Sequence, residues 1–334
     1  MNIYSTLKEL CRVSAVSGRE GGICSFIKEK IEKYVDCVSV DTLGNLIACK
    51  KGRDSARKLM LCAHMDEIGF IVNFIEDSGL LRVAAIGGVD FASRAYSRVV
   101  SESGVAGVLV PEDCTKPADI KADKCYIDIG AKSKKEAERK ARIGDFFVAR
   151  EELFRLGSSR VSGKALDDRV GCLVLLEVAR RLGNESLEYD VYFVFSVQEE
   201  VGCRGSRTAT YAIAPTEAIC IDVTRTGDVP GAKPMACALG KGVAIKVKDS
   251  SVICSEQIVS ALSDVAKKEG IRTQMEILEG GGTDTSSMQM IGAGSLAGAL
   301  SIPTRYIHTG VETCDLSDVE ACVELLYKYI LTKV

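Results

Sequence analysis

Side chains able to bind a metal ion follow short apolar segments at several places in the sequence. The candidates are His64, Asp66, Glu199, Glu200, Asp222 and His308, together with the pair Asp167-Asp168 that precedes an apolar helix. In open α/β sheets, ligands and reacting groups collect outside the carboxyl ends of the strands, so these separate segments are expected to meet at one edge. Imidazole and carboxylate groups together are typical ligands of zinc, cobalt or manganese.

Each candidate also has an ordinary structural explanation. Asp167 or Asp168 can cap the helix that follows, and adjacent glutamates such as Glu199 and Glu200 commonly form a solvated loop. A histidine at the end of a strand more often packs than binds a metal. The coincidence favours a metal site, because the chain has only two histidines and both follow apolar runs.

Charge balance favours two metal ions over one. The expected ligands are two imidazoles and three carboxylates: His64, His308, Glu200, Asp222 and one of the pair Asp167-Asp168. Two divalent cations with these ligands leave a net positive site that can hold a hydroxide, and an aspartate between the ions can bridge them at roughly 3.5–4 Å. Asp66 can accept the second imidazole N–H of His64. Glu199, left without a ligand role, is the candidate general base.

The elements that must position these residues form an α/β pattern interrupted by a β-rich segment. Before residue 69 and after residue 163, short apolar strands alternate with helices, which predicts a mostly parallel sheet covered on both faces. Between residues 70 and 162, short alternating segments separated by glycines predict hairpins of a small β-rich unit. Helices are predicted at 4–13, 20–34, 132–142, 168–182, 255–269 and 316–332. A hairpin is predicted at 37–48, with its turn at Gly44-Asn45, and strands at 58–63, 189–197, 217–223, 242–247, 273–278, 296–302 and 305–307.

Composition excludes several classes of protein. The 334 residues are 46% hydrophobic and 27% charged, which rules out disorder and a coiled coil. Lys and Arg (43) nearly balance Asp and Glu (46), so we expect no nucleic-acid partner. No segment approaches the ~20 apolar residues of a membrane span, and residues 1–12 do not resemble a signal peptide. The 14 cysteines include no C-x-x-C pair, so we expect reduced thiols in a cytoplasmic protein.

The segments around the candidate residues closely resemble metallopeptidase family 42 over essentially the whole chain, in the family's order. They are AHMDEIGF (63–70), GKALDDRVG (163–171), VQEEVGCRGS (197–206), IDVT (221–224), GGGTDTSSMQ (280–289) and RYIHTGVET (305–313). The family holds glutamyl, leucyl and deblocking aminopeptidases and tetrahedral self-compartmentalising aminopeptidases. Some of its members have been labelled endoglucanases.

The resemblance implies a role for each candidate. The implied ligands of two divalent ions, zinc, cobalt or manganese, are His64, Asp167, Glu200, Asp222 and His308, with Asp167 as the bridge. It implies Glu199 as the general base, Asp66 as the residue that orients His64, and Asp168 as the residue that positions the bridge, through a cis peptide bond. Gly282, Thr283 and Asp284 match a loop that lines the pocket for the first side chain of the substrate. Gln289 stands where many relatives carry a histidine.

The resemblance also implies the architecture and the activity. Residues 1–69 and 163–334 would form the catalytic α/β domain, and residues 70–162 an inserted, barrel-like domain that supports a homodimer or a homododecamer. The expected enzyme is a dinuclear aminopeptidase for short peptides, in which a metal-bound hydroxide attacks the scissile carbonyl and Glu199 moves the proton. The alternatives are a related deacylase or carboxypeptidase, and an endoglucanase. Against the last, the chain is only 6% aromatic and has no Trp.

Overall fold

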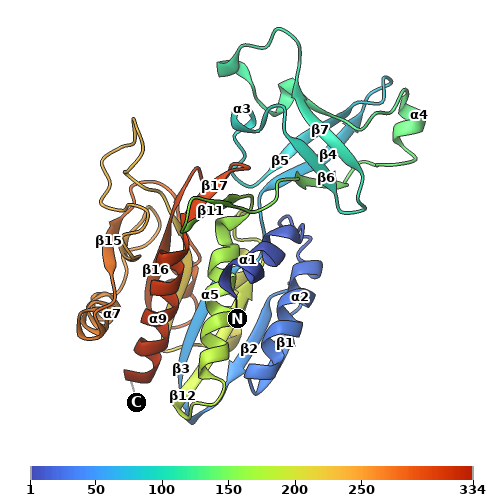
Figure 1. Cartoon of the computed structure of the whole chain (residues 1–334). Helices are drawn as coiled ribbons and strands as arrows, with labels where there is room; N and C mark the ends of the chain where they lie inside the picture. The colour runs from blue at the N-terminus through green and yellow to red at the C-terminus, as the bar shows by residue number, and fades with distance from the viewer. Residues whose placement is uncertain (1, 333–334) are drawn as a thin grey trace.

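The computed structural model describes residues 2–332 as an eleven-stranded mixed sheet with helices on both faces, joined to a closed six-stranded barrel (Figure 1). The sheet has the order β1-β2-β12-β3-β13-β16-β17-β11-β10, and β14 and β15 extend from β16. Its strands are β1 (Cys37–Val40), β2 (Leu46–Lys50), β3 (Gly52–His64), β10 (Phe154–Leu156), β11 (Arg160–Gly163), β12 (Leu187–Ser196), β13 (Glu217–Thr224), β14 (Val243–Lys248), β15 (Thr273–Ile277), β16 (Leu296–Arg305) and β17 (Glu312–Asp315).

The sheet is mixed rather than mostly parallel. Its centre is parallel, as predicted, because β12, β3, β13 and β16 run in one direction. The flanking strands β2, β14 and β17 are antiparallel to their central neighbours. Loop length explains the pair β16–β17, as it does the antiparallel pair β1–β2 at the sheet edge: each is joined by a few residues, whereas a parallel return needs a crossover of about a dozen or more.

Helices bury both faces of the central strands. On one face pack α1 (Ile3–Arg12), α2 (Gly21–Ile31), α5 (Leu166–Leu182), α7 (Glu256–Glu269) and α9 (Leu316–Thr332), and on the other α6 (Arg204–Ile213) and α8 (Thr285–Met290). Along β3, Leu59 and Leu61 join the first apolar cluster, while Met60 and Cys62 join the second. Alternation between two buried faces explains why this strand is continuously apolar in sequence.

The barrel stands above the strand ends and is drawn in light blue to green at the top of Figure 1. Its strands, in barrel order, are β4 (Gly69–Ile75), β5 (Leu81–Ile86), β8 (Cys125–Asp128), β7 (Ala106–Pro111), β6 (Arg98–Ser101) and β9 (Phe146–Ala149). Phe70, Leu109, Ile127 and Phe147 are among its core residues. The short elements outside the sheet and barrel are α3 (Phe91–Arg94), α4 (Lys134–Ala137), η1 (Glu32–Tyr34), η2 (Pro117–Asp119) and η3 (Ala122–Lys124).

Several element predictions need correction. The helix expected at 132–142 is reduced to α4, because this charged segment buries only Ala137 and Ala141 and has no broad apolar stripe. The strands expected at 296–302 and 305–307 form a single strand, β16, which ends at Arg305. The short elements α6, α8, β10, β11 and β17 were not predicted. All 14 cysteines are free, as predicted. Among residues 2–332, no helix is long and apolar enough to cross a membrane.

Candidate metal centre

The predicted ligands come together where the central strands end. His64 is the last residue of β3, Asp222 lies near the end of β13, and Glu200 follows β12. Asp167 lies in the first turn of α5. His308 lies in the turn after β16, at a positive φ of 68°, and not at the end of a strand. The parallel direction of β12, β3, β13 and β16 brings these segments to one edge of the sheet.

Asp167 lies between the two imidazoles. Its Oδ1 is 3.0 Å from Nε2 of His64, and its Oδ2 is 3.3 Å from Nε2 of His308. Asp168 is arranged differently, because its carboxylate accepts the backbone N–H groups of His64 (3.2 Å) and Gly171 (3.0 Å). The peptide bond between the two aspartates is cis. Of the pair, only Asp167 has one oxygen directed at each histidine.

Each imidazole also has a second carboxylate beside it. Nε2 of His308 is 3.2 Å from Oε1 of Glu200, and Nε2 of His64 is 4.0 Å from Oδ1 of Asp222. The ligand atoms of His64, Asp167 and Glu200 lie within 4.8 Å of one another. Buried carboxylates gathered this closely repel one another, whereas divalent cations bound by imidazole and carboxylate groups relieve that repulsion. The donor set therefore fits divalent cations.

Burial and the neighbouring carboxylates shift the pKa values of these groups when no cation is bound. Burial opposes the charged form of His308, but hydrogen bonds with Asp167 and Glu200 outweigh it and raise the pKa of His308 to about 11. Burial raises the pKa of Asp222 well above its usual range, and the negative charge of Asp167 raises it further. Without a cation these groups favour their protonated forms, so metal binding at this centre should release protons.

Asp66 connects one ligand to the segment that carries the two glutamates. Nδ1 of His64 is 3.1 Å from the carbonyl oxygen of Asp66 and 3.4 Å from its Oδ1. The Asp66 carboxylate accepts the backbone N–H groups of Glu199 (3.0 Å) and Glu200 (3.2 Å), and the hydroxyl of Ser17 (2.6 Å). The sequence predicted that Asp66 contacts the His64 ring, and the nearer of its two acceptors is the backbone carbonyl oxygen. The hydrogen bonds from the backbone of Glu199 and Glu200 to Asp66 were not predicted, since they depend on how β12 ends beside β3.

A cleft of about 380 Å³ opens onto the centre. Glu199 lines it, and Oε2 of Glu199 is 4.0 Å from Nε2 of His64. Gly282 also lines it, but Thr283 and Asp284 are buried behind the wall. Asp284 accepts hydrogen bonds from two serine hydroxyls, both at 2.6 Å. Gln289 does not line this cleft, and its amide donates to the carbonyl of Ile253.

The model of the M42 glutamyl aminopeptidase family matches residues 44–325, most of the chain. The chain belongs to this family. It is 37% identical to the lysyl aminopeptidase of Pyrococcus furiosus, over 96% of this chain and 95% of that protein.

Solved structures of other peptidases superpose closely on this chain. It is similar to an aminopeptidase of the archaeon Desulfurococcus kamchatkensis, with a TM-score of 0.94, 38% identity, and coverage of 98% of this chain and 94% of that one. The TET1 peptidase of Pyrococcus horikoshii, which can assemble into a tetrahedron or a large octahedral shell, has a TM-score of 0.89 at 34% identity, with coverage of 98% and 99%. The chain is therefore a peptidase, and membership of the M42 family supports aminopeptidase activity and the use of divalent metal ions.

Two further residues hold this M42 centre together and were missed in the sequence. Glu312 is 2% exposed, and its two carboxylate oxygens accept the backbone N–H groups of His308 (2.8 Å) and Asp167 (3.1 Å). The carbonyl oxygen of Gly88, in the loop after β5 of the barrel, is 2.9 Å from Nδ1 of His308. Glu312 lies within the motif RYIHTGVET, so its place in that motif could have identified it as part of the site. Nothing in the sequence links Gly88 to a histidine 220 residues away.

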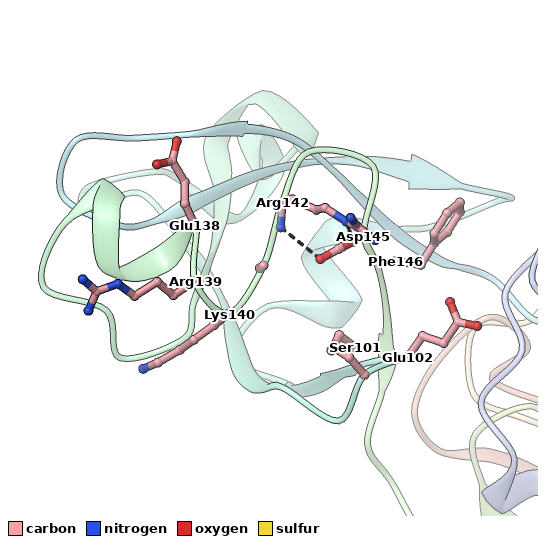
Figure 2. Close-up of a pocket in the computed structure, with 10 residues that line it drawn as sticks. Ser101, Glu102, Glu138, Arg139, Lys140, Arg142, Asp145 and Phe146 are labelled. Atoms are coloured by element: carbon pink, nitrogen blue, oxygen red, sulfur yellow. Dashed lines mark hydrogen bonds and ion pairs between the residues drawn. The ribbon is translucent and has the colours of Figure 1, made fainter.

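A second depression lies on the barrel alone. Figure 2 shows it lined by residues of the segments 101–103 and 138–146, where Arg142 forms an ion pair with Asp145. None of the predicted ligands, nor Glu199, lines it. The chemistry of this M42 chain is therefore assigned to the cleft at the strand ends.

Proposed function

We propose that this chain is a dinuclear aminopeptidase that removes N-terminal residues from short peptides. The observation that carries this proposal is the Asp167 carboxylate, which has one oxygen beside each imidazole at the edge of an open cleft. The names of its relatives support the aminopeptidase activity, and the pairing of groups around Asp167 supports a two-metal centre.

The proposed ligands divide into two sets that share Asp167. His64 and Asp222 would hold one ion, and His308 and Glu200 the other. Zinc, cobalt and manganese all suit imidazole and carboxylate ligands, and we favour zinc or cobalt. When bound, a pair of such ions supplies an activated water and polarises the scissile carbonyl.

Glu199 is the proposed general base. Both histidines of the chain are ligands in this assignment, so the proton must move through a carboxylate. Oε2 of Glu199 is directed toward the centre, and burial raises the pKa of Glu199 well above its usual range. A base with a raised pKa accepts a proton from water more readily and can pass it to the leaving amine. Asp66 positions this group through the backbone N–H of Glu199.

The substrate would enter beside the segment 280–282, which lines the cleft together with Leu278 and Arg225. Of the loop predicted to line the first side-chain pocket, we propose that Gly282 contacts substrate. Thr283 and Asp284 would support that wall from behind. We further propose that the barrel, within residues 70–162, supports a cytoplasmic homodimer, with the assembly of the TET1 peptidase as the precedent for a larger shell.

Two variants test the assignments. Glu199→Gln should retain about two metal ions per chain by elemental analysis, yet lose nearly all hydrolysis of aminoacyl anilides, because glutamine cannot take up the proton. His308→Ala should instead reduce the metal content. Full activity in the first variant, or unchanged metal content in the second, would contradict the role proposed for that residue.

Substrate panels separate this function from its alternatives. An aminopeptidase needs a free amino terminus, so acetylation of a peptide should abolish its cleavage. Continued cleavage of the blocked peptide would favour a deacylase or a carboxypeptidase. Release of sugar from carboxymethyl cellulose would favour an endoglucanase. That reaction would need two carboxyl groups, one on either side of the glycosidic bond.

A further inference from the structure

One thiol contacts the side chain proposed as the base. Sγ of Cys203 lies 3.2 Å from Oε1 of Glu199, while Oε2 of the same carboxylate is turned toward His64. Of the 14 cysteines, Cys37 and Cys114 are exposed, Cys203 is partly buried, and the others are buried. Cys203 also lines the cleft that holds the metal centre.

Hydrogen bonds hold the backbone of Cys203 in a defined conformation. The carbonyl oxygen of Glu199 accepts the N–H groups of Gly202 (2.8 Å) and Cys203 (2.9 Å), which closes a tight turn after β12. Cys203 adopts a left-handed φ of 51° directly before α6, a conformation uncommon for a residue with a Cβ. Its carbonyl oxygen in turn accepts the hydroxyls of Ser206 (3.1 Å) and Ser287 (3.3 Å). These hydrogen bonds hold the backbone of Cys203 in place beside Glu199.

We propose that Cys203 is a positioning residue for the reaction: its S–H donates to Oε1 of Glu199 and leaves Oε2 as the oxygen that takes the proton. This inference rests on the proposed function, because it gives Cys203 a role only if Glu199 is the base. It adds to the M42 centre a residue that is neither a ligand nor a group that exchanges protons with the substrate.

Charge explains why a donor is needed at this point. An oxygen of Glu199, Sγ of Cys203 and an oxygen of Asp284 all lie within 4.8 Å of one another. Asp284 is 1% exposed and is held in place by the hydroxyls of Ser196 and Ser206. A fixed carboxylate so close repels the Glu199 carboxylate, and the S–H of Cys203 offsets that repulsion by donating to Oε1. Hydrogen bonds to an ionised acceptor are stronger than bonds between neutral groups, although a thiol is a weak donor.

The thiol is suited to donate and not to react. Burial and the negative charge of Glu199 raise the pKa of the Cys203 thiol. A thiol that stays protonated keeps its hydrogen for the bond to Oε1 and is a poor nucleophile.

Two substitutions at this position test the proposal, since one keeps a donor and the other removes it. We expect Cys203→Ala to lower kcat about 10-fold, the loss of one hydrogen bond to a charged group, with KM and metal content unchanged. Cys203→Ser, which restores an O–H donor, should stay within about 3-fold of the parent enzyme. Cys37→Ser, an exposed cysteine outside the cleft, is the control for removal of a thiol.

A double variant makes the assignment specific to the base. In a Glu199→Gln background, Cys203→Ala should cause no further loss, because the two residues act as a unit. Equal kcat in Cys203→Ala and the parent, an equal loss in the Ser and Ala variants, or a fall in metal content would each overturn the proposal. An active Glu199→Gln enzyme would instead overturn the base assignment, so the two failures are distinguishable.

Discussion

Glu312 links the backbone of His308 to that of Asp167, and a substitution there tests whether this link supports the centre. One of its oxygens accepts the N–H of His308 at 2.8 Å, and the other accepts the N–H of Asp167 at 3.1 Å. Glu312→Gln preserves the shape of the side chain but replaces one acceptor oxygen with an NH2 group. That NH2 group must then face a backbone N–H, and neither group can accept.

The magnitude follows from the burial of this contact. A hydrogen bond to a charged group contributes about 1.5–3 kcal/mol, and a buried donor left without a partner costs about 1–3 kcal/mol. Since Glu312 is 2% exposed, water cannot easily replace the lost acceptor. We expect the free energy of unfolding to fall by about 2–4 kcal/mol. Because both backbone groups belong to proposed metal ligands, metal affinity should fall about 10- to 100-fold.

Two measurements check this prediction. Urea unfolding of the metal-free protein reports the stability, and titration of zinc or cobalt against a competing chelator reports the affinity. Glu320→Gln is the matched control, because it makes the same chemical change at an exposed residue of α9. Unaltered metal affinity in Glu312→Gln, or an equal loss in Glu320→Gln, would refute the reasoning.

Two other substitutions probe the surroundings of the centre. Gly88→Ala would place a Cβ 2.9 Å from Nδ1 of His308, so we expect about 10-fold weaker metal binding by chelator competition. Gly21→Ala, which faces open space, should leave affinity unchanged; equal affinities in both variants would refute the steric argument. Lys246→Met should lower the free energy of unfolding by about 3–5 kcal/mol, since it leaves the buried Glu276 carboxylate, 2.5 Å from Nζ, without its cation. Adding Glu276→Leu should recover most of this loss in urea unfolding, and a double variant as unstable as the single one would contradict it.

Residue types alone pointed to most of the side chains that the structure brings together at the strand ends. The two histidines and the carboxylates at 199–200 and 222 stand at or beside the ends of apolar runs, and a strand buried on both faces must be apolar throughout. The pattern therefore located where polar groups emerge from the sheet. It also predicted the parallel central strands and the β-rich segment between them, because alternation and glycine spacing are local properties of the chain.

The pattern predicted the hairpin of β1 and β2 but not the antiparallel pairing of β2, β14 and β17 with the central strands. The continuous strand β16 (Leu296–Arg305) was expected as two separate strands. His308 consequently lies in a turn at positive φ, where an apolar run followed by a histidine had predicted a strand end. Strand direction at these edges depends on loop length and on which neighbour is available, so it is decided by the assembled sheet.

The sequence by itself determined which side chains can bind metals and that several of them emerge at strand ends. Only the tertiary structure decided how these groups face one another. It directs the two oxygens of Asp167 at different histidines and uses the carboxylate of Asp66 to hold Glu199 and Glu200. It also brings Gly88 of the barrel against His308. The physical reason is that these are directional contacts across 100 residues or more, whereas hydropathy and spacing describe only neighbours along the chain.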